Sequence, residues 1–155
     1  MNRVLSSLVS AVLVTLPLAF AGAASAEHAV PFKGSYSGTF TVSLPAVSST
    51  ASGHETHLGK STETIAVTLT PDGPGCQTNL GTGVLTAANG DQIFFDATGT
   101  SCFNPTTGLV DLSGTQTITG GTGRFEGASG TLTVSGTGNP ATGTISYTLE
   151  GSISY

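Results

Sequence analysis

The sequence is poor in charged and aromatic residues: of its 155 residues, 8% are charged and 6% are aromatic. Only four residues are Lys or Arg, against nine Asp or Glu, and the formal net charge is −5. Nucleic-acid binding depends on clustered Lys and Arg that displace the counterions around the phosphates. No such cluster is present, so we expect no nucleic-acid partner.

Several chemical motifs are also missing. The sequence has two cysteines, and their separation excludes a Cys-x-x-Cys redox motif. It contains no Gly-x-Ser-x-Gly, the motif of one large class of hydrolases. His54 and His57 lie at positions i and i+3 in a Gly- and Ser-rich segment, whereas the helical zinc motif needs i and i+4. We therefore expect no metal site.

Only one apolar segment approaches the length of a membrane span, and it lies at the N-terminus. Arg3 precedes an apolar run that closes with Ala24-Ser25-Ala26, the small-residue pattern that signal peptidase accepts. We expect residues 1–26 to be a signal peptide cleaved after Ala26, and residues 27–155 to be one exported domain that leaves the membrane. The alternative is an uncleaved anchor, because about 20 apolar residues span a bilayer.

Apolar and polar residues alternate along most of residues 27–155, and no amphipathic helix of useful length interrupts them. The pattern predicts about seven antiparallel strands, with room for an eighth before Gly59, and a loop over the Ser-, Pro- and Thr-rich residues 43–59. Closure of such a sheet removes its exposed edges. We expect an all-β protein, a small closed antiparallel barrel of about eight strands; a two-sheet sandwich is the alternative.

The Asn89-Gly90 pair predicts a hairpin. If Ala88-Asn89-Gly90 is a three-residue loop with Gly90 in the left-handed conformation, the facing positions along the hairpin bring Cys76 opposite Cys102. Cysteine pairs persist as disulfides in exported proteins. We therefore predict a Cys76–Cys102 disulfide; two free thiols are the alternative.

Two polar residues share the alternation of the apolar ones. Glu63 has the phase of Ile65, and Gln116 that of Ile118, so both are expected to face inward. A buried carboxyl group has a raised pKa, which makes Glu63 a candidate acid or base, with Tyr36 or Tyr147 as hydrogen-bond donors. The alternatives are a solvated strand end for Glu63 and a hydrogen-bonded interior amide for Gln116.

Residues 118–130 read Ile-Thr-Gly-Gly-Thr-Gly-Arg-Phe-Glu-Gly-Ala-Ser-Gly. This segment resembles one in plant allene oxide cyclases, and its Gly-Gly-Thr-Gly-x-Phe part resembles one in dirigent proteins. The resemblance implies an eight-stranded calycin-like barrel, commonly trimeric, without a metal or organic cofactor. In physical terms, Phe125 would plug one barrel end and Arg124 would cap carbonyls or pair with Glu126. The glycines would supply left-handed backbone in a tight connection; they are Gly120, Gly121, Gly123, Gly127 and Gly130.

The functional residues of these two families differ from those found here. Ser129 stands where dirigent proteins carry a pocket arginine, and residues 37–43 lack the Glu and Asn of the cyclases. Because neither catalytic set is matched, we expect a binding protein for a small apolar molecule rather than an enzyme. The residues expected to line the pocket are Tyr36, Phe40, Phe95, Gln116 and Tyr147. The alternatives are a cyclase or isomerase resembling the allene oxide cyclases, and a structural or cell-surface protein whose barrel is filled by its own side chains.

Overall fold

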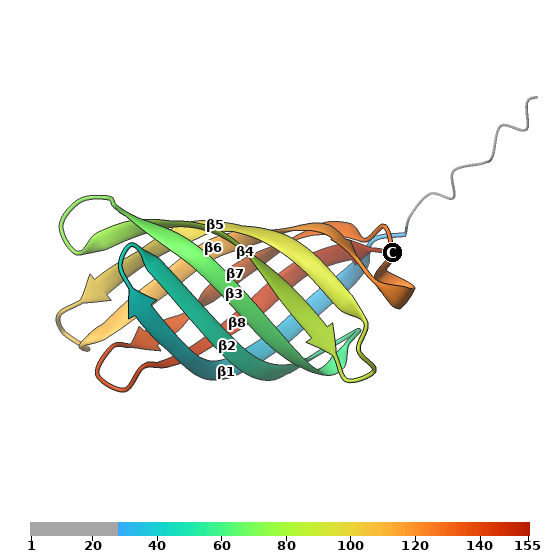
Figure 1. Ribbon diagram of the computed structural model, residues 1–155, viewed down its shortest axis with the longest axis horizontal. Helices are drawn as coiled ribbons and strands as arrows, with labels where there is room; N and C mark the ends of the chain where they lie inside the picture. The colour runs from blue at the N-terminus through green and yellow to red at the C-terminus, as the bar shows by residue number, and fades with distance from the viewer. Residues whose placement is uncertain (1–27) are drawn as a thin grey trace, which may run out of the picture.

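The structure, a computed structural model, describes residues 28–155. The predicted signal peptide and its cleavage site lie outside these residues. Eight strands form a closed barrel in which each strand pairs antiparallel with its neighbours in the chain, and the last strand pairs with the first (Figure 1). The strands are β1 (Val30–Ser43), β2 (Ala46–Glu55), β3 (Gly59–Pro71), β4 (Cys76–Ala87), β5 (Gln92–Asn104), β6 (Leu109–Gly121), β7 (Ser129–Asn139) and β8 (Thr144–Ser154). The predicted all-β closed barrel is confirmed.

The loop predicted over residues 43–59 is wrong for most of that segment, because β2 occupies it and supplies the eighth strand. Three of its inward residues are small and lie opposite large side chains on the neighbouring strands: Gly53 lies opposite Tyr36, Ser49 lies opposite both Phe40 and Ile65, and Ala51 lies opposite Glu63. A strand with small and polar inward residues shows little alternation in hydrophobicity. Its backbone is nevertheless paired on both sides, which is what makes it a strand.

The hairpin between β4 and β5 has the predicted register. Gly90 adopts φ +91° and donates its backbone N–H to Ala87, and Cys76 lies opposite Cys102. The predicted disulfide between these two cysteines is present. A disulfide of this kind indicates an oxidising, extracytoplasmic environment.

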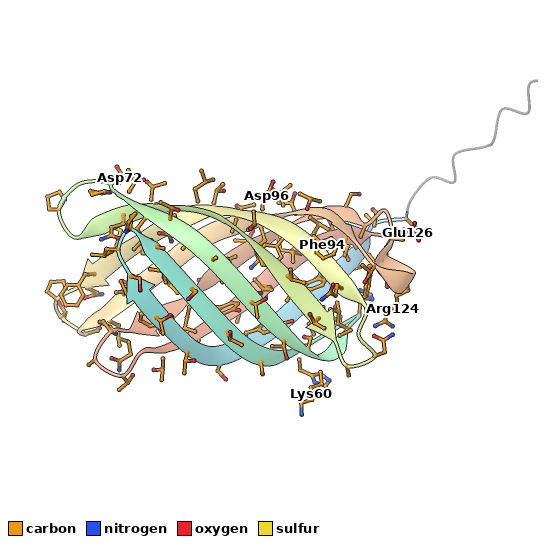
Figure 2. All side chains as sticks on the ribbon, viewed as in Figure 1. Lys60, Asp72, Phe94, Asp96, Arg124 and Glu126 are labelled. Carbon is orange, nitrogen blue, oxygen red and sulfur yellow. A yellow bond between two sulfur atoms is a disulfide. The ribbon has the colours of Figure 1, made fainter. Side chains whose placement is uncertain are left out.

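The two ends of the barrel carry different connections. The loops β1–β2, β3–β4, β5–β6 and β7–β8 lie at one end, and the other connections lie at the end that carries the C-terminus (Figure 1). Figure 2 shows Arg124 and Glu126 at this second end and Asp72 at the first. We call these the loop end and the C-terminal end.

The half of the barrel near the C-terminal end is occupied by its own side chains, and we call it the packed half. The largest fully buried apolar ones there are Phe32, Leu85, Ile93, Phe95, Phe125, Leu132, Leu149 and Ile153. A short 3-10 helix, η1 (Gly123–Phe125), places Phe125 as the predicted plug, with its ring 4.9 Å from that of Tyr155. Arg124 lies over the Phe125 ring and pairs with Asp91 at 3.5 Å, so its ionic partner is Asp91 and not Glu126.

The Gly-rich segment around η1 follows the expected conformation at four of its five glycines. Gly120, Gly123, Gly127 and Gly130 all have positive φ, and Gly121 does not. Within residues 28–155 there is no helix long and apolar enough to cross a membrane.

Candidate functional site

The half of the barrel near the loop end is hollow. A cavity of about 400 Å³ occupies it, within the range of small-molecule sites. Apolar side chains form most of its wall: Phe40, Val47, Ile65, Val67, Leu69, Val110, Leu112, Val134 and Ile145. Val and Gly are common among the lining residues, whereas the packed half contains the large rings of Phe32, Phe95 and Phe125.

The cavity opens at the loop end between exposed apolar side chains. Val42, Leu44 and Phe103 line it there and are 53%, 70% and 50% exposed. We call these three residues the mouth. Apolar groups held in water at the opening of an apolar cavity are typical of binding sites.

At the other end of the cavity, three polar side chains form what we call its floor: Glu63, Gln116 and Tyr147. The amide nitrogen of Gln116 donates a 3.0 Å hydrogen bond to Oε1 of Glu63. Among the described residues, no partner binds Oε2 of Glu63, Oε1 of Gln116 or the hydroxyl of Tyr147. Three buried polar groups thus keep hydrogen-bonding capacity at the bottom of an apolar cavity.

The barrel register explains why these three side chains reach the interior. Glu63 on β3 lies opposite Ala51 of β2, and Gln116 on β6 lies opposite Ala97 of β5. These small neighbours leave room for long polar side chains to extend across the barrel. Glu63 and Gln116 are both only 2% exposed.

Tyrosine rings support the floor from below. The ring of Tyr147 stacks on that of Tyr36 with centroids 5.5 Å apart and planes inclined by 11°. The hydroxyl of Tyr36 shares a 2.6 Å hydrogen bond with the hydroxyl of Ser61. Tyr36 is therefore satisfied within the packed half, while Tyr147 presents its unpaired hydroxyl to the floor.

Burial controls the ionisation of the floor. Removal from water raises the pKa of Glu63 to about 7, although the nearby Tyr147 and Gln116 oppose the shift. The interaction with the Tyr147 hydroxyl lowers the pKa of Glu63, although this hydroxyl makes no regular hydrogen bond. Burial, together with the Glu63 carboxylate, raises the pKa of Tyr147 well above its ordinary value. Glu63 therefore changes its charge near neutral pH, and Tyr147 stays a protonated donor.

A second buried carboxyl group lies outside the cavity. Burial raises the pKa of Glu55 to about 7, opposed by backbone N–H groups of Leu58 and His57. Leu58 donates its N–H to Oε1 of Glu55, which ties down the turn between β2 and β3 at the C-terminal end. Glu55 therefore stabilises this turn and does not line the cavity.

The structure separates the residues predicted for the site into two groups. Phe40, Gln116, Tyr147 and Glu63 line the cavity together. Tyr36 and Phe95 are 2% and 1% exposed in the packed half and do not line it. Alternation along a strand distinguishes inward from outward residues, but it does not locate a residue along the barrel axis.

Sequence reasoning missed a polar group higher in the cavity wall. Asn79 and Ser101 line it from β4 and β5, and the Asn79 amide nitrogen donates a 2.7 Å hydrogen bond to the Ser101 hydroxyl. The side-chain carbonyl oxygen of Asn79 is buried without a partner among residues 28–155. The alternation of the sequence could have identified it, because Asn79 is in phase with the inward Leu85 on the same strand.

The described residues contain no group of three or more His, Cys, Asp or Glu suited to hold a metal ion. Fold and site together define a closed eight-stranded antiparallel β-barrel with an internal cavity open at one end. No protein-family model matches the sequence, and no curated protein matches it.

Proposed function

We propose that this protein binds a small, mostly apolar molecule inside the barrel. The observation that carries the proposal is the cavity itself: an apolar wall leads from an apolar mouth to a polar floor with unused hydrogen-bonding groups. Transfer of a ligand's apolar surface from water to this wall contributes about 25 cal/mol per Å². The floor would orient the ligand through its polar group.

The hollow half argues against the structural alternative. A purely structural barrel needs no internal space, and close packing contributes to stability. Here large buried side chains such as Phe32, Phe95 and Leu132 occupy one half, while the other half holds a cavity of about 400 Å³. The uneven filling supports a binding role.

Two tryptophan substitutions test the proposal with matched chemistry. Val67 points into the cavity, whereas Leu80 on the neighbouring strand β4 is 64% exposed. The neutral dye N-phenyl-1-naphthylamine should bind the wild-type protein at one site with enhanced fluorescence. Val67→Trp fills part of the cavity and should weaken binding at least about tenfold. Leu80→Trp should leave binding unchanged.

The result that would overturn the proposal is no dye binding by a folded wild-type protein, or equal affinity in Val67→Trp and Leu80→Trp. Circular dichroism and thermal unfolding of both variants establish that they are folded. A variant that does not fold is replaced by Ile65→Phe, which narrows the same cavity with a smaller change in volume.

We infer that the domain is exported after cleavage behind Ala26. The Ala24-Ser25-Ala26 pattern and the disulfide between Cys76 and Cys102 support this inference. Intact mass spectrometry of the protein from its own culture medium tests it: a chain beginning at Glu27 and lighter by two hydrogens is expected. A chain that retains residues 1–26 would contradict it.

We also propose a relationship to the allene oxide cyclase-like and dirigent-like barrels. The supporting feature is the segment of residues 118–130, whose Phe125 closes the barrel end. Homotrimerisation, which is common in those families, is part of this proposal. Light scattering during size-exclusion chromatography should give the mass of three chains. The mass of a single chain would contradict homotrimerisation.

A second candidate function is acid–base isomerisation of a bound molecule. The specific observation in its favour is Glu63, a buried carboxyl group with a raised pKa that lies at the cavity floor beside the hydroxyl of Tyr147. Such an enzyme would show a pH–rate profile that Glu63→Gln abolishes. If ligands bind in the cavity and none is converted, the isomerase candidate is wrong and only the binding function remains.

A further inference from the structure

The unused polar atoms of the cavity are mainly hydrogen-bond acceptors. The Gln116 amide nitrogen faces Oε1 of Glu63, so its own Oε1 is free to accept, and Oε2 of Glu63 is free as well. Nearer the mouth, the side-chain carbonyl of Asn79 adds a third free acceptor. Buried polar atoms in folded proteins nearly always have a partner. An occupant that satisfies these atoms must therefore bring hydrogen-bond donors.

The only charge that the described lining of the cavity can carry is negative. Glu63 is the one carboxyl group among the described residues that line it, and none of those residues is Lys, Arg or His. The other titratable groups around Glu63 are Tyr147 on β8 and Tyr36 on β1, and burial keeps both neutral by raising their pKa values. No cation within the described cavity compensates the Glu63 carboxylate. The site therefore disfavours an anionic ligand and favours a cationic one.

Aromatic side chains line the cavity, with Tyr147 beside the Glu63 carboxyl group and Phe40 nearer the mouth. Phe40 and Tyr147 both line the cavity, and Tyr147 is held in place by stacking on Tyr36. Aromatic faces attract ammonium groups through the ring quadrupole, most strongly when the pair is removed from water. A carboxylate, an amide carbonyl and an aromatic face each attract a buried ammonium ion, and this cavity contains all three.

We propose that the ligand is a cationic amphiphile: an apolar body along the cavity wall, with a protonated amine on Glu63 and Gln116 at the floor. This inference rests on the proposed binding function and names its ligand class. The ammonium N–H groups donate to Oε2 of Glu63 and Oε1 of Gln116. The apolar body runs past Phe40 toward the mouth.

Binding of the amine should depend on pH in a defined direction. Glu63 accepts the ammonium group only when it is ionised, and an alkylamine with an ordinary pKa of about 10 stays protonated throughout this range. Affinity should therefore be high at pH 8 and fall as Glu63 is protonated below about 7. A neutral ligand of the same length should not lose affinity on acidification.

Three ligands of equal chain length test the proposal by displacement of N-phenyl-1-naphthylamine: decylamine, 1-decanol and decanoate. At pH 8 the wild-type protein should bind decylamine at least about tenfold more tightly than 1-decanol, with decanoate weakest. At pH 5.5 the preference for the amine should be lost. Glu63→Gln should remove the preference at pH 8 while the dye and 1-decanol still bind.

Glu126→Gln is the matched control, because it makes the same charge change at an exposed residue of the C-terminal end. It should retain the full amine preference, which excludes a general effect of net charge. Should Glu63→Gln not fold, the pH dependence of the wild-type protein decides the question by itself.

The outcomes separate the two proposals. Equal affinities for decylamine and 1-decanol, or tightest binding of decanoate, with the dye bound inside the barrel, would overturn the amine inference and leave the binding function standing. Failure of the dye and all three ligands to bind would overturn the binding function and the inference with it.

Discussion

Gln116 on β6 donates a 3.0 Å hydrogen bond to Glu63 on β3 across the interior of the barrel, although 53 positions separate them in the chain. The bond joins two residues that are each 2% exposed, and it leaves one oxygen of each without a partner in the described part of the chain. A carboxyl group held in this way is costly to ionise. Its cost can be measured in the stability of the protein.

The first prediction concerns the pH dependence of folding. Burial raises the pKa of Glu63 from 4.5 to about 7, so the folded state binds this proton more tightly than the unfolded state. The resulting stability is fully present below pH 4.5 and is lost as pH rises through about 7. Between pH 4.5 and 8, the free energy of unfolding measured in urea should fall by on the order of 3 kcal/mol more in the wild type than in Glu63→Gln.

Glu55→Gln is a useful comparison, because burial also raises the pKa of Glu55 to about 7. It should flatten the pH profile in the same direction without affecting ligand binding. Glu126→Gln should leave the profile unchanged. Equal profiles for wild type and Glu63→Gln would show that Glu63 is solvated in the folded protein.

The second prediction concerns the disulfide between Cys76 and Cys102. It closes a loop with a sequence separation of 26 in a hairpin whose ladder is already formed. Replacing both cysteines with serine should lower the free energy of unfolding by about 3 kcal/mol, chiefly because the unfolded chain gains freedom. The barrel should still fold, and reduction of the wild-type protein should give the same loss. No loss on reduction would mean that the bond does not form.

The third prediction concerns the plug at the C-terminal end. Phe125 is fully buried against Tyr155, so Phe125→Ala should cost about 3–5 kcal/mol in urea unfolding. Phe103→Ala makes the same change at the mouth, where the ring is 50% exposed. It should cost less than about 1 kcal/mol and act on ligand affinity instead. Equal losses of unfolding free energy in Phe125→Ala and Phe103→Ala would contradict a barrel that is packed at one end and open at the other.

The fourth prediction concerns close contact between strands. A Cβ atom at Gly38 would lie 2.0 Å from the backbone oxygen of Thr50, so Gly38→Ala requires the strands to move apart. It should cost about 2 kcal/mol or more. At Gly138 the nearest atom to a new Cβ is Cε1 of Phe40 at 3.5 Å, an ordinary contact. Gly138→Ala should therefore change unfolding by much less, and a loss as large as that of Gly38→Ala would contradict this geometry.

Local patterns accounted for much of the barrel. The alternation around Ile65 and Ile118 identified inward faces, and the Asn89-Gly90 hairpin signal set the register that joins Cys76 to Cys102. These features depend on contacts within one strand or one hairpin, where the side-chain period and the turn geometry decide the outcome. They left room for an eighth strand before Gly59 but indicated a loop in that segment, because several inward residues of β2 are small or polar and its strand character comes from pairing with both neighbours.

The sequence by itself determined an all-β chain, the inward phase of Glu63 and Gln116, and the pairing of the two cysteines. Only the tertiary structure decided that Phe95 belongs to a packed half while Phe40 lines a cavity, and that Glu63 meets Gln116. The physical reason is barrel closure. Strand stagger sets the height of each inward residue along the axis, and residues far apart in the chain meet across the interior only after all eight strands have paired.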